Sequence, residues 1–132
     1  MVEHQMESGE TSSNLVLFFL ILFLERREMT GLETIKKLSD AALFEQLAEE
    51  CVELAHASLK MARKLRNENP TPKTIEEIYD SVIEELADVT LTSSILIELD
   101  NLDATSIENL ANEKARRWIK RLEKHFNEKG EN

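Results

Sequence analysis

The chain has 132 residues, the length of a single domain, and its 16 basic and 26 acidic residues leave a net charge of −10. A surface this acidic is a poor partner for nucleic acid or an anionic membrane, because proteins bind both of these mainly through Lys and Arg. The three glycines are too few and too scattered for a phosphate-binding loop or for the turns of an all-β fold. The single cysteine, Cys51, excludes an internal disulfide and favours the reducing cytoplasm.

The first 28 residues differ in composition from the rest of the chain. They contain an apolar run, Leu15 to Leu24, which is shorter than the roughly 20 residues that a membrane-spanning helix needs. Acidic residues precede the run, where a signal peptide carries positive charge. We interpret 1–28 as an N-terminal extension outside the domain, which would then comprise 29–132. The alternatives are a buried or partner-docking helix and a membrane anchor, of which the anchor is the least favoured.

From Met29 onward the apolar pattern is helical. The segment Thr30-Gly-Leu-Glu33 has the form of a capping box, in which a hydroxyl and a carboxylate three residues apart satisfy the first backbone N–H groups, and predicts a short helix to about Leu38. The pair Ser39-Asp40 is suited to cap a long helix over about 41–67. The segment 67–73, with two prolines, then predicts a break.

Two further long helices follow this break. Thr74-Ile-Glu-Glu77 is a second capping box and predicts a helix over about 75–99. Thr105-Ser-Ile-Glu108 has the same form and predicts a helix to about Phe126. The expected fold is all-α, a bundle of three long helices plus a short N-terminal helix. Because such a chain makes a small core, we expect it to assemble into a helical-bundle homo-oligomer.

Acidic residues lie at matching positions on the first two long helices. On a helical wheel, Glu50 and Glu53 fall at roughly −60° and −120° from the centre of the first apolar stripe, and Glu85 and Asp88 fall at the same offsets from the second. The stripes are Leu43, Leu47, Cys51, Leu54, Met61 and Leu65 on the first helix and Ile75, Ile78, Val82, Leu86, Val89 and Leu96 on the second. If the helices pack by these stripes, the four carboxylates line one groove. Glu49, Glu84 and His56 are expected to point away from the seam.

Four carboxylates in one groove repel one another and need a neutralising cation. All-oxygen ligands suit hard cations, so the pattern favours Mg²⁺, with Mn²⁺ as a possible substitute. The alternative is an ordinary solvated acidic face. Local ion pairs do not account for Glu50 and Glu85, since neither has a Lys or Arg three or four residues away.

The third long helix is basic. Lys114, Arg117 and Arg121 lie within or beside its apolar stripe of Ile107, Ala111, Ala115, Trp118 and Leu122. Cations so close to an expected core need a partner. They either pair with the acidic groove or bind the phosphates of a nucleotide, and Lys60, on the Glu53 side of the first long helix, is a weaker candidate for the same role.

Glu49-Glu50-x-x-Glu53 followed by Glu85-x-x-Asp88 resembles the EExxE…ExxD signature of the MazG-like all-α nucleoside triphosphate pyrophosphohydrolases. The flanking segments LAEECVELAHASLK, EELADV and KARRWIKRLEKH also fit, and the resemblance covers about 32–126. It implies Mg²⁺-dependent hydrolysis of an NTP or dNTP to the monophosphate and pyrophosphate by a homodimer or homotetramer. It places the metal ligands at Glu50, Glu53, Glu85 and Asp88.

Hydrolysis also needs a group that takes a proton from the attacking water, and Glu53, or Glu49 through a water, is the expected base. A related enzyme class, the phosphoribosyl-ATP pyrophosphohydrolases, is the first alternative. A non-catalytic helical interaction module with an acidic groove is the second. The expected partner is the nucleotide substrate, with no nucleic acid or membrane.

Overall fold

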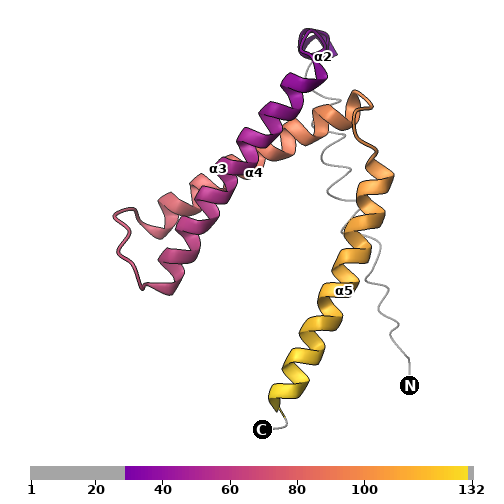
Figure 1. Ribbon diagram of the computed structural model, residues 1–132. Coiled ribbons are helices and arrows are strands. Elements are labelled where there is room, and N and C mark those ends of the chain that lie inside the picture. The colour runs from indigo at the N-terminus through magenta and orange to yellow at the C-terminus, as the bar shows by residue number, and fades with distance from the viewer. Residues whose placement is uncertain (1–28, 131–132) are drawn as a thin grey trace, which may run out of the picture. The chain divides into compact units, whose positions relative to one another are not determined.

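The computed structural model describes residues 29–130, and all of its regular structure in that range is helical (Figure 1). The elements are α2 (Met29–Ile35), α3 (Asp40–Arg66), α4 (Ile75–Glu98) and α5 (Ala104–Gly130). The all-α prediction is therefore confirmed for this range, whereas the proposed extension, 1–28, lies outside it. None of the described helices is long and apolar enough to cross a membrane.

Helix α3 begins and ends close to where its sequence signals predict. Ser39 is its N-cap, and the Ser39 hydroxyl accepts a hydrogen bond from the Ala42 N–H at 3.2 Å. At the other end Asn67 adopts a left-handed conformation with φ of 53°, and its N–H donates to the Arg63 carbonyl at 3.0 Å. The shorter α2 ends at Ile35, three residues before the expected Leu38.

Helix α4 starts with the predicted capping box. The Thr74 N–H donates to the Glu77 carboxylate at 2.7 Å, and the Glu77 N–H donates to the Thr74 hydroxyl at 3.2 Å. The helix ends in a Schellman motif, in which Asp100 has φ of 59° and the Asn101 N–H donates to the Leu96 carbonyl at 2.9 Å. Both ends of α4 are thus stabilised by local hydrogen bonds.

The predicted start and end of the last helix were wrong. Helix α5 starts at Ala104, and its cap is Asp103, whose carboxylate accepts a hydrogen bond from the Ser106 N–H at 2.9 Å. Thr105 lies inside the helix, because an aspartate two residues earlier already satisfies the first turn. The helix continues past Phe126 to Gly130.

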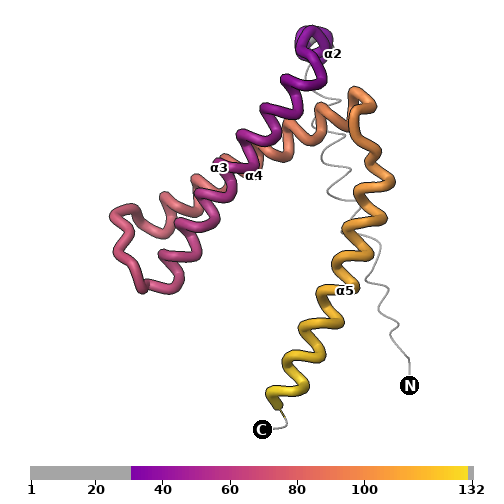
Figure 2. Tube along the Cα trace, viewed as in Figure 1, coloured from indigo at the N-terminus to yellow at the C-terminus, as the bar shows by residue number. Residues whose placement is uncertain are grey.

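The described chain divides into two compact units, 29–94 and 95–130. In the first unit, α3 and α4 run side by side in opposite directions (Figures 1 and 2). The loop 67–74 that joins them is braced by Lys64, whose ammonium donates to the Thr71 carbonyl at 3.3 Å. We call this pair of helices the hairpin.

The packed face of the hairpin is rotated from the predicted apolar stripes toward the acidic side. Leu43, Ile78 and Leu96 of the predicted stripes are buried as expected. On the acidic side of the stripes, Ala57 is also buried, and Glu50 and Glu85 are half-buried. Four members of the predicted stripes are instead exposed: Cys51, Leu65, Ile75 and Leu86. Each stripe is wider than one neighbouring helix can cover, and the small Ala57 side chain lies on the covered part.

Several large apolar side chains of the hairpin face solvent. They include Phe44, Val52, Leu59, Tyr79 and Ile83, each between 43% and 56% exposed. The fully buried side chains in residues 29–130 with the largest volumes are Ile78 and Leu96. The core that one chain provides is therefore small, as the sequence predicts.

In the second unit, α5 has no buried residue. Its predicted stripe is exposed along its length, with Trp118 at 62%. The expectation that this stripe forms a core is therefore not met in the single chain. Lys114, Arg117 and Arg121 are exposed as well, so burial does not force them to pair.

Candidate functional site: a three-carboxylate cluster in the hairpin

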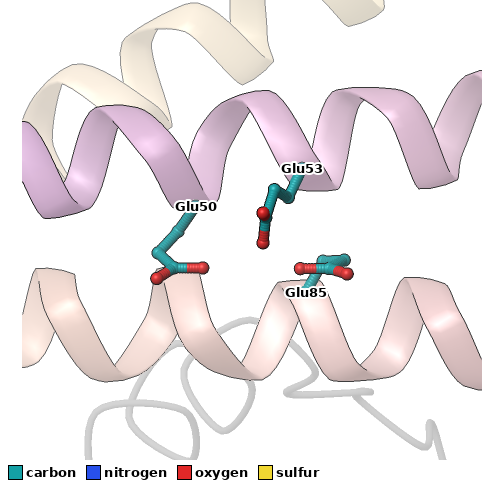
Figure 3. A group of neighbouring side chains, drawn as sticks. All are labelled: Glu50, Glu53 and Glu85. Carbon is teal, nitrogen blue, oxygen red and sulfur yellow. The ribbon is translucent and has the colours of Figure 1, made fainter.

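Three of the four predicted metal ligands lie together between α3 and α4. Glu50 and Glu53 extend from α3 and Glu85 extends from α4 toward them (Figure 3). One carboxylate oxygen from each residue lies within 4.8 Å of the other two. Glu50 and Glu53 are three residues apart and so share a helix face, while the antiparallel packing brings Glu85 opposite them.

The electrostatics of the cluster reflect this crowding. The pKa of Glu85 is raised above its ordinary value, chiefly because its carboxylate is partly desolvated and next because the charge of Glu53 lies close. The Gln46 side-chain amide donates to the Glu50 carboxylate, which satisfies one of its oxygens. Within residues 29–130, no ion pair joins the three carboxylates to a Lys or Arg. The cluster, named here the carboxylate cluster, therefore keeps an uncompensated negative charge.

Asp88, the fourth predicted ligand, is not a member of this cluster. It is half-buried on α4 one turn beyond Glu85, and its charge also raises the pKa of Glu85. Glu49, the alternative base, is exposed on α3 and lies outside the cluster as well.

The donor set suits a hard divalent cation. Three carboxylates supply oxygen ligands only, and no histidine or thiolate joins them in the described part of the chain. A cation bound there would relieve the repulsion that raises the Glu85 pKa. The residues present therefore fit Mg²⁺ or Mn²⁺ better than a softer metal.

A pocket of about 290 Å³ adjoins the carboxylate cluster on the hairpin. Glu53 and Glu85 belong to both, and the predicted phosphate ligand Lys60 lines the pocket with them. The remaining lining residues are His56, Ala57, Lys73, Ile78 and Ser81. We call this cavity the hairpin pocket.

Sequence reasoning missed three polar residues of this pocket. His56 is exposed, as expected, but it lies three residues after Glu53 and therefore on a neighbouring side of α3. This spacing could have predicted that His56 lies near Glu53. Ser81 lies four residues before Glu85 on α4 for the same reason, and its hydroxyl donates to the Glu77 carbonyl at 3.0 Å. Lys73 lies in the irregular loop, where no helical periodicity predicts the direction of a side chain.

The three predicted phosphate ligands of the last helix belong to the second unit. Arg117 approaches Glu113 at 3.6 Å, an exposed pair one turn apart on the same helix. Such pairs contribute little and are readily exchanged for another partner. The role of Lys114, Arg117 and Arg121 at the carboxylate cluster stays a prediction.

Comparison of the chain with protein-family models, with curated proteins and with solved structures finds no match.

Proposed function

We propose that the protein is a nucleoside triphosphate pyrophosphohydrolase, which converts an NTP or dNTP to the monophosphate and pyrophosphate. The observation that supports this proposal most directly is the convergence of Glu50, Glu53 and Glu85 from two helices within 4.8 Å. The same residues carry the resemblance to the MazG-like family. The carboxylate cluster, with Asp88 one turn away, would hold Mg²⁺, with Mn²⁺ as a substitute.

In this proposal, bound Mg²⁺ supplies charge neutralisation for the triphosphate and its leaving group. The chain's own residues bind, orient and accept the proton. Lys60, in the hairpin pocket, contacts phosphate oxygens, and Lys114, Arg117 and Arg121 contribute further positive charge. Water forms a bond to the α-phosphorus, the bond from this phosphorus to the bridging oxygen breaks, and pyrophosphate leaves with the bond's electron pair.

The proton of the attacking water passes to a carboxylate. Glu53 is the favoured base, because it lies in both the carboxylate cluster and the hairpin pocket. Glu49 lies one turn earlier on α3 and would act through an intervening water. Glu49→Gln separates the two, because Glu49 lies outside the carboxylate cluster and its loss should leave the Mg²⁺ response intact. The variant should keep most of the hydrolysis rate if Glu53 is the base and should lose it if Glu49 is the base.

We further propose a helical-bundle homodimer or homotetramer in the cytoplasm. The exposed apolar side chains of the hairpin support assembly, since a single chain leaves them in water. The single free cysteine, Cys51, supports a reducing compartment.

The test is pyrophosphate release measured over the eight common NTPs and dNTPs, with and without Mg²⁺. Phosphoribosyl-ATP serves as a ninth substrate, and cleavage of it alone would favour the related enzyme class. Glu85→Gln should abolish the release, while Glu84→Gln is the matched control. Absence of Mg²⁺-dependent release from all nine compounds would refute the enzyme and favour a helical interaction module.

A further inference from the structure

The hairpin pocket has acidic side chains at one end and basic side chains toward the loop. Along α3, Glu53, Ala57 and Lys60 line it at spacings of three and four residues, so they share one face. Glu53 and Lys60 are seven residues apart, about 10 Å along the helix axis at 1.5 Å per residue. Lys60 is nearer than Glu53 to the end of α3 at the loop 67–74, and Lys73 lies in that loop.

Lys60 and Lys73 are the two lysines that line this pocket. Within residues 29–130, neither Lys60 nor Lys73 forms an ion pair, although Glu53 and Glu85 line the same pocket. The buried side chains of Ala57 and Ile78 line the same pocket. Two ammonium groups that line one pocket and have no ion-pair partner among the described residues are suited to bind a polyanion, because each offers three donors and a full charge.

We propose that this basic end of the hairpin pocket binds a pyrophosphate group through Lys60 and Lys73, with His56 as a further donor. The assignment of the group to the terminal phosphates of a nucleotide rests on the proposed function. This pyrophosphate site gives Lys73 and His56 a binding role. It also orients the substrate, with the terminal phosphates toward the loop and the α-phosphate toward Glu53. The released pyrophosphate would contact the same three side chains before it leaves the pocket.

Calorimetric titration of the full chain with inorganic pyrophosphate, in the presence of Mg²⁺, tests the proposal. Lys73→Gln and Lys60→Gln should each weaken binding about tenfold, the effect of removing one charge-assisted hydrogen bond. Lys37→Gln is the matched control, because it removes the same charge from the turn after α2, outside the pocket. Lys73→Arg should restore most of the affinity, which shows that the charge and not the fold was lost.

Unchanged pyrophosphate affinity in the Lys60→Gln/Lys73→Gln double variant would overturn the proposal, as would an equal loss in Lys37→Gln. A nucleoside monophosphate provides the second arm, since it lacks the terminal phosphates. Its affinity should not change in Lys73→Gln, and a tenfold loss there would place the α-phosphate at the loop and overturn the stated orientation.

The outcomes also separate this proposal from the function on which it rests. Lysine-dependent pyrophosphate binding without release from any nucleotide would refute the enzyme and keep the pyrophosphate site. Mg²⁺-dependent hydrolysis with lysine-independent pyrophosphate binding would keep the enzyme and refute the site.

Discussion

Replacing Glu85 by Gln tests whether the carboxylate cluster binds a cation. The change keeps the shape of the side chain and removes one of three converging charges. Because burial and the charge of Glu53 raise the Glu85 pKa, the ionised carboxylate is unfavourable in the metal-free protein. The metal-free variant should therefore melt at a higher temperature than the wild type, and its response to Mg²⁺ should be smaller.

The expected size of the Mg²⁺ response follows from mass action. Loss of an outer-shell partner of a metal ligand weakens affinity by about 10–100-fold, so loss of a ligand itself should reach about 100-fold. A ligand at 100 times its Kd stabilises a protein by about 2.7 kcal/mol, and the same ligand at its Kd stabilises it by about 0.4 kcal/mol. When Mg²⁺ is present at about 100 times the wild-type Kd, it is at about the Kd of the variant. At about 4 °C per kcal/mol for a chain of this length, it should then raise the wild-type melting temperature by about 11 °C and that of the variant by about 2 °C.

Thermal melts with and without Mg²⁺, on wild type, Glu85→Gln and Glu84→Gln, measure these shifts. Glu84 precedes Glu85 in sequence, is exposed and lies outside the cluster. The charge of Glu84 raises the pKa of Glu85 less than desolvation and Glu53 do. Glu84→Gln should therefore retain nearly the whole stabilisation by Mg²⁺. An equal Mg²⁺ response in the two variants would refute a cation site at the carboxylate cluster.

Four further predictions follow from the fold. Thr74→Ala removes the capping hydroxyl of α4 and should cost about 1 kcal/mol in urea unfolding. Ile78→Ala should cost about 2–5 kcal/mol in the same assay, because Ile78 is 1% exposed. Hydrogen bonds from Ser106 lower the pKa of Asp103. The ionised Asp103 carboxylate therefore stabilises the fold fully above its unfolded-state pKa, and this stabilisation is lost as pH falls through the lower folded-state pKa. Asp103→Asn should remove this pH dependence from thermal melts recorded across the acidic range. Light scattering at micromolar concentration should report an oligomer, and a stable monomer would contradict the proposed assembly.

Local interactions explain why much of the fold could be predicted. Ser39 and the Thr74–Glu77 pair cap their helices through side chains three residues from the N–H groups they satisfy, so the sequence alone specifies them. The start of α5 was misplaced because Asp103 and Thr105 both precede helical residues, and only the backbone geometry chooses between them. The pairing of these helices is a different matter, since it depends on contacts between residues far apart in sequence.

The sequence by itself determined that the described chain is helical, where its long helices lie, and that Glu50, Glu53 and Glu85 occupy matching helix faces. Helical periodicity is a local property, and it suffices for these conclusions. Tertiary packing decided which part of each wide apolar stripe is covered. It rotated the contact toward the acidic side, leaving Cys51 and Leu86 exposed and bringing three carboxylates together without Asp88. It also brought Lys73 from the loop into the pocket beside Lys60 and Glu53, because the direction of a loop side chain follows from the packing of the helices that the loop joins.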